Sequence, residues 1–103
     1  MLKNIMWEID CSLNEYADNE YDMRSYLNDI RDYEFVTDRY GEFSGVRVWF
    51  AIGDPSIYLD TTTNSILGAG GLSFMLIEIT DSVSDTVNQI FKEIYKNEIQ
   101  NKS

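Results

Sequence analysis

The last quarter of the chain carries a regular apolar stripe. Five large apolar residues recur there at spacings of four, three, one and three, namely Val83, Val87, Ile90, Phe91 and Ile94. This is the period of one face of an α-helix. Ser82 and Asp85 have the spacing of a capping box at the start of this segment. The pattern predicts a helix over residues 82–97.

The middle of the chain alternates with a period of two, which is typical of half-buried strands. Within residues 45–52, one face carries Val46, Val48 and Phe50 and the other carries Arg47 and Trp49. Further strands are predicted at residues 33–40, where an edge strand is expected, at 57–59, from 66 onward, and at 72–79. Turns are expected at Gly53-Asp54-Pro55, at residues 61–64 and at Gly68–Gly71. Residues 72–79 are rich in large apolar side chains, so this strand is expected to be central.

The first third of the chain is acidic and has helical spacing in places. Met23, Tyr26, Leu27 and Ile30 predict a helix over residues 23–32, which Asp22 could cap. Ser12 and Glu15 have the spacing of a second capping box, which predicts a short helix over residues 13–19. Residues 1–9 fit a strand or a helix. The expected fold is therefore α+β: an antiparallel four- to five-stranded sheet with a C-terminal helix packed on one face and an acidic helical N-terminal region.

Length and composition are those of one folded domain spanning residues 1–103. With 44% hydrophobic residues, the chain can bury a core without a metal or a disulfide. The single cysteine, Cys11, cannot form an internal disulfide and is expected to be a small buried residue. Met1–Cys11 mixes charged with apolar residues, unlike a signal peptide, and the longest apolar stretch, Val48–Ile52, is far too short to span a membrane. We therefore expect a cytoplasmic protein.

Charge is unevenly distributed along the chain. The net charge is −10, from 18 acidic and 8 basic residues. Residues 1–45 hold 11 acids and 4 bases, a net charge of −7, whereas residues 46–103 hold 7 acids and 4 bases, a net charge of −3. A surface of this kind repels nucleic acid and attracts basic proteins over long range. Such charge can also act only to keep a protein in solution, but solubility alone does not require the acids to be concentrated at one end.

The acidic N-terminal region is the candidate binding site. Carboxylates can take the places of phosphates, because the Lys and Arg side chains that line a nucleic-acid groove also bind Asp and Glu. Tyr16 and Tyr21 are candidate anchors, since tyrosine adds contact area and a hydrogen-bonding tip. The predicted partner-binding residues are Glu8, Asp10, Glu15, Tyr16, Asp18, Glu20, Tyr21, Asp22, Asp29 and Asp32.

In its size, its lack of histidine, its acidic run from Glu8 to Asp22 and its one-sheet, one-helix layout, the chain resembles the small acidic inhibitors of phages and mobile elements, the anti-CRISPR and antirestriction proteins. The resemblance implies an inhibitor that blocks the nucleic-acid site of a basic effector, such as a host-defence nuclease, by phosphate mimicry. Two alternatives stay open. One is an immunity protein that neutralises a basic toxin. The other is a small structural or oligomerising module with Trp49 and Phe74 in a hydrophobic interface.

No catalytic or cofactor motif accompanies the acidic region. The chain lacks histidine, and its candidate acid–base groups, Asp54 and Asp60, have the positions of a turn former and a strand end. A calcium loop beginning at Asp18 would place Met23 where glycine is needed. Gly68–Gly71 lacks the Lys-Ser/Thr of a phosphate loop. The sequence predicts a binding protein without a cofactor or a metal, not an enzyme.

Overall fold

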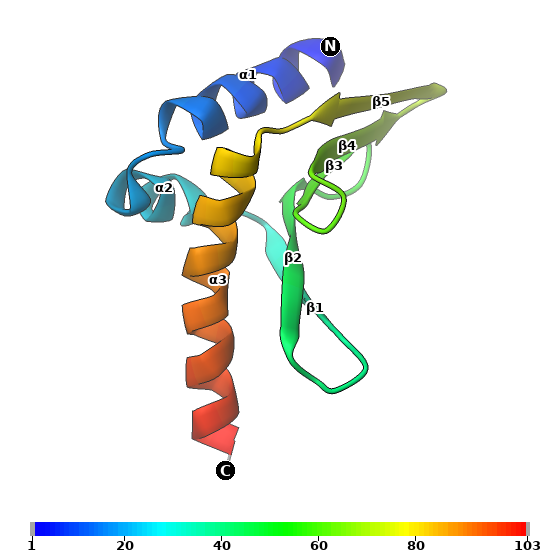
Figure 1. Ribbon diagram of the computed structural model, residues 1–103. Helices are drawn as coiled ribbons and strands as arrows, with labels where there is room; N and C mark the ends of the chain where they lie inside the picture. Colours follow the sequence, from blue (N-terminus) through cyan, green and yellow to red (C-terminus); the bar gives the residue numbers. More distant parts are fainter. Residues whose placement is uncertain (1, 103) are drawn as a thin grey trace.

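The computed structural model describes residues 2–102, and its centre is a single antiparallel sheet (Figure 1). Each strand pairs with its neighbours in the sequence, in the order β1-β2-β3-β4-β5. The strands are β1 (Asp32–Thr37), β2 (Phe43–Ala51), β3 (Ser56–Asp60), β4 (Ser65–Gly70) and β5 (Ser73–Glu78). The predicted meander is confirmed with five strands, of which β1 and β5 form the edges.

Three helices lie on one face of this sheet (Figure 1). Helix α1 (Leu2–Glu15) packs on β4 and β5, and helix α3 (Asp81–Lys102) packs on β2. Helix α2 (Glu20–Leu27) lies between them in sequence and contacts α3. The predicted α+β class and the predicted C-terminal helix are both confirmed. Among the described residues, no helix is long and apolar enough to cross a membrane.

The core fills the space between the helices and the sheet. The predicted inward residues of β2, Val46 and Val48, are fully buried. They share the core with Leu59 of β3 and with Val83 and Val87 of α3, all without exposed surface. Burying each such side chain contributes about 1.5–3 kcal/mol to folding. The apolar stripe of α3 is therefore what holds this helix on the sheet.

Gly68 is placed by helix packing and not by a turn. It lies inside β4, where an added Cβ would overlap the sulfur of Met6 on α1. The predicted turn at Gly68–Gly71 is therefore wrong in extent, since β4 continues to Gly70. The turn itself lies at Gly71, whose φ of 57° is in the left-handed region that glycine adopts readily.

The N-terminal helices differ from their predicted boundaries. Helix α1 runs unbroken through Ser12, because the apolar side chains of Met6, Ile9 and Leu13 are buried at helical spacing along it. The separate helix predicted at residues 13–19 is wrong. Helix α2 begins three residues earlier than predicted, at Glu20. Asn19 is its N-cap, and its side-chain oxygen accepts a hydrogen bond of 3.0 Å from the Asp22 N–H.

Strand β5 lies at the edge of the sheet, so the prediction of a central strand is wrong. Met75 and Ile77 pack toward the helices, whereas Phe74 and Leu76 are 69% and 49% exposed on the other side. Cys11, expected to be buried, is also exposed, because it lies on the outer side of α1.

Candidate functional site

The predicted acidic site contains two stripes of carboxylates that meet at one tyrosine. On α1, Glu8, Ser12 and Glu15 follow one another at spacings of four and three and so share a side of the helix. On α2 and the turn after it, Asp22, Tyr26 and Asp29 have the same spacings. We call Glu8, Glu15, Asp22 and Asp29 the acidic helix face.

Tyr26 joins the two stripes. The Ser12 hydroxyl lies beside the Tyr26 phenol, and Glu8 lies close enough that its charge acts on the same group. Burial is the main cause that raises the pKa of Tyr26, and the negative charge of Glu8 raises it further. Glu8 from α1 and Asp22 from α2 therefore lie near one ring, although 14 positions separate them in the sequence.

In the described part of the chain, the carboxylates of the acidic helix face have no basic side chain as an ion-pair partner. Among the ion pairs of the described residues, none involves Glu8, Glu15, Asp22 or Asp29. Glu8 and Glu15 are two helical turns apart, about 10 Å along the axis. Such a spacing lets two basic side chains of a partner approach separately.

Two other predicted residues, Glu20 and Asp18, are held by contacts within the chain. Arg24 on α2 binds both Glu20 and Glu93 of α3, and its pKa is raised, first by the hydrogen bond to Glu20. Asp18 accepts a hydrogen bond of 3.2 Å from the hydroxyl of Ser82. These contacts fasten the α1–α2 connection and α2 to α3, so Glu20 and Asp18 are less available to a partner.

Asp10 and Asp32 lie away from the acidic helix face. Asp10 is half-buried at the edge of the α1 core stripe, and burial raises its pKa. Asp32 lies at the start of β1 and accepts a hydrogen bond of 2.8 Å from the N–H of Tyr33.

The two predicted anchors have different surroundings. Tyr16 is half-buried, with its ring centroid 5.7 Å from that of Tyr26, which in turn lies 6.0 Å from Phe50 of β2. It therefore supports the fold as well as the surface. Tyr21 is 81% exposed and is free to contact a partner.

The face of the sheet opposite the helices carries a second surface, which was not predicted from the sequence. Four residues form a row across it, each directly opposite the next: Trp49, Tyr58, Leu67 and Leu76. Within residues 2–102 no helix covers this row, which we call the open-face row. Its signal in the sequence is a spacing of nine residues, at outward positions where polar side chains are usual.

A charged row runs beside the open-face row. Arg47 binds Asp60 at 3.2 Å and Glu34 at 3.6 Å. Burial alone would raise the pKa of Asp60, but hydrogen bonds from Thr62 and Arg47 outweigh it and hold the pKa below its usual value. Asp60 is thus a fixed carboxylate that closes β3, as the sequence predicted, and is poorly suited to act as a base. Asp54 accepts a hydrogen bond of 2.8 Å from the N–H of Gly71 and so has a structural role too.

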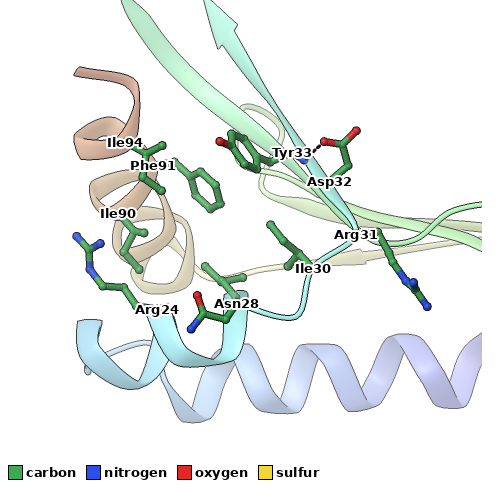
Figure 2. Close-up of a pocket in the computed structure, with 10 residues that line it drawn as sticks. Arg24, Asn28, Ile30, Arg31, Asp32, Tyr33, Ile90, Phe91 and Ile94 are labelled. Carbon is green, nitrogen blue, oxygen red and sulfur yellow. Dashed lines mark hydrogen bonds between the residues drawn. The ribbon is translucent and has the colours of Figure 1, made fainter. Parts of the chain in front are cut away.

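A hollow of about 610 Å³ lies between α3 and the connection from α2 to β1 (Figure 2). Ile30, Ile90, Phe91 and Ile94 give it apolar walls, and Arg24 lies at its rim. In Figure 2 the Arg31 side chain points away from these residues. With Arg24 engaged by Glu20 and Glu93, the hollow offers apolar contact and no nucleophile. In the described part of the chain, no cluster of three or more potential ligands is arranged to hold a metal ion.

Comparisons with protein-family models, with curated proteins and with solved structures gave no match.

Proposed function

We propose that this protein is a cytoplasmic inhibitor that binds a basic, nucleic-acid-binding effector and occupies its nucleic-acid site. The effector class that fits the small acidic character is a host-defence nuclease, such as a CRISPR effector, met by a phage or mobile element. In this proposal the protein is a binding protein and not an enzyme. The proposal rests on the acidic helix face.

The proposal is supported by the lack of ion pairs at those carboxylates among the described residues. Charges already paired within a chain gain little from a partner, whereas free carboxylates can form charge-assisted hydrogen bonds with Lys and Arg. Glu8, Glu15, Asp22 and Asp29 belong to the second kind. Tyr21 adds an exposed aromatic ring close to Asp22, and such a ring can stack on guanidinium groups.

The net charge of the whole chain acts at longer range than these contacts. At −10, the chain is attracted to a basic groove before contact, which raises the rate of association at low salt. The same attraction weakens steeply as salt screens it. Binding of the proposed kind is therefore fast, salt-sensitive and competitive with nucleic acid.

The test compares two variants with the same change in charge. The site variant is Glu8→Lys with Glu15→Lys, and the control is Glu42→Lys with Asp85→Lys, two exposed acids away from the acidic helix face. Tagged proteins are used to capture partners from a nuclease-treated lysate of the source cells. The captured protein is identified by mass spectrometry and is then eluted with competing DNA or RNA.

We expect one nucleic-acid-binding protein in stoichiometric amount, released by the competitor. The site variant should lose affinity by about tenfold or more, and the control by no more than about twofold. Equal losses in both variants would show that only total charge matters, and unchanged capture by the site variant would overturn the proposal. A captured toxin without a nucleic-acid site would instead identify an immunity protein.

A further inference from the structure

Strand β5 is an edge strand whose only charged residue is Glu78, at its last position. Native proteins block exposed edges with charges, prolines or bulges, because an open edge pairs with other strands. The chain has no charged residue from Thr61 to Ile77, and the register of β4 with β5 is uninterrupted. The opposite edge, β1, differs on both counts, with Asp32 and Glu34 along it and an irregularity at Val36/Thr37.

The backbone of β5 offers hydrogen-bonding groups to a further strand. The Ile79 N–H donates to the carbonyl of Asn64, the position that continues the β4–β5 ladder. Backbone groups in an antiparallel pair point alternately toward and away from the neighbour. Ile77 and Met75 therefore direct theirs to β4, whereas Phe74, Leu76 and Glu78 direct theirs outward. The group that fits this edge is another β-strand.

We propose that β5 pairs antiparallel with β5 of a second copy of this chain, on a two-fold axis at Met75. Each Phe74 then lies opposite Leu76 of the partner subunit, and both belong to the outward-pointing set. This register keeps side chains on their own faces, since residues paired across strands must share a face. The two five-stranded sheets become one ten-stranded sheet with all helices on one side.

Charge makes this edge the place where a second copy of the chain can approach most closely. A chain of net charge −10 repels its own copies over most of its surface, and the uncharged segment from Thr61 to Ile77 is where that repulsion is least. In the proposed register Glu78 lies opposite Leu72 of the partner subunit, so no acids face each other. A shift by two residues would replace the two Phe74–Leu76 pairs across the axis by a single pair of Leu76 with Leu76 of the partner subunit. It would also set Glu78 against the partner's Phe74, inside the partner's strand, whereas the proposed register sets it against the partner's Leu72, in the turn beyond that strand.

The dimer also extends the apolar rows of the open face. Leu76 ends the open-face row at the β5 edge, and Phe74 ends the neighbouring row, opposite Ala69. Across the two-fold axis, the row that ends at Leu76 continues into the row that ends at the partner's Phe74. Phe74 and Leu76 then each have a cross-strand neighbour on both sides, so the part of each side chain that faces the open edge in the single chain is covered.

Oligomeric state measured on the full chain tests the proposal. We expect light scattering after size exclusion to show a concentration-dependent dimer that persists at high salt, unlike binding to a basic partner. Leu76→Lys should weaken dimerisation by at least about tenfold. Its matched control, Ile99→Lys, replaces an apolar residue of nearly the same exposure, 50% against 49% for Leu76, near the C-terminal end of α3, and should dimerise like the unmodified chain. A monomer at all concentrations, or equal dimerisation of the two variants, would overturn the proposal.

Cross-linking tests the register independently of affinity. In a Cys11→Ser background, Met75→Cys places two thiols opposite each other at a non-hydrogen-bonded pair, where Cα atoms lie about 4.5 Å apart, within the range of a disulfide. Ser73→Cys would lie opposite Ile77 of the partner subunit and has no matching thiol. We expect mild oxidation to cross-link the first variant and not the second. Equal cross-linking of both would contradict this register, and no cross-linking of either would contradict the pairing.

Discussion

Trp49 and Tyr58 face each other across β2 and β3 with ring centroids 4.4 Å apart, on the side of the sheet that carries no helix. Two aromatic side chains in contact at an outward position are costly to keep hydrated, and neither belongs to the core on the other face. The pair is therefore the centre of the open-face row, and its strength can be measured directly.

The Trp49–Tyr58 contact should appear as a coupling energy. Cross-strand aromatic pairs contribute about 0.5–1.5 kcal/mol beyond the area that they bury. We expect a double-mutant cycle of Trp49→Ala and Tyr58→Ala, measured by urea unfolding, to give a coupling in that range. Additive effects of the two substitutions would show that the rings stack without stabilising the fold.

Gly68→Ala should destabilise the protein, because its new methyl group would overlap the Met6 sulfur beneath α1. Overpacking of this kind costs about 1–3 kcal/mol in the free energy of unfolding. The control is Ala69→Ser, on the neighbouring position of β4, which is exposed and should change stability by less than about 0.5 kcal/mol. Chemical denaturation compares the two, and equal stabilities would show that α1 shifts without cost.

Glu15→Lys should stabilise the folded chain while weakening its binding to a basic partner. Glu15 is the last residue of α1, whose final turn has no basic residue, and a cation is favoured at that end of a helix. We expect a gain of about 0.3–1 kcal/mol in the free energy of unfolding at low salt. Thermal unfolding followed by circular dichroism measures it. A loss of stability would mean that Glu15 has a structural role beyond the contacts described for it.

Asp60 should make stability depend on pH on the acid side. Its pKa in the folded protein lies below the usual 3.8, so the folded state releases the proton more readily than the unfolded state. The stabilisation is therefore fully present above the unfolded value and is lost as pH falls through the folded value. Asp60→Asn should cost roughly 1.5–3 kcal/mol near neutral pH, and the difference from the unmodified chain should shrink below pH 3.8.

Urea unfolding of the two proteins across this pH range provides the measurement. Asp29→Asn, at an exposed carboxylate in no described ion pair, serves as the control for the change from a carboxylate to an amide. A pH-independent difference between Asp60→Asn and the unmodified chain would show that Asp60 acts through its shape and neutral hydrogen bonds alone.

Local periodicity predicted much of the fold because each signal is local. The stripe from Val83 to Ile94 needs only the helical repeat, and the alternation around Val48 needs only the pleat of a strand. The meander order also follows, since strands joined by short turns pair with their neighbours. These elements did not depend on knowledge of distant contacts.

The predictions that failed depended on such contacts. Strand β5 is at the edge because no further strand of the described chain pairs with it, and its composition does not contain that information. Its apolar composition alone predicts a central strand. The local pattern predicts a turn at Gly68. Its contact with the sulfur of Met6 joins residues that are 62 positions apart, so no local pattern indicates it. Within the predicted binding site, no local pattern indicates that Arg24, which binds Glu20, also binds Glu93 on α3.

The nine-residue spacing of Trp49, Tyr58, Leu67 and Leu76 makes the open face sensitive to the lengths of the hairpins. If one residue were inserted into the turn at residues 61–64 and the turn kept its present length, the pairing of β3 with β4 would slip by one residue. This slip would move Leu67 to the helix side and bring Ile66 out into water. Every later strand would be inverted in the same way. Insertions or deletions of one residue that slip a strand should therefore be far more damaging here than substitutions in the same turns, whereas a slip of two residues keeps every side chain on its face.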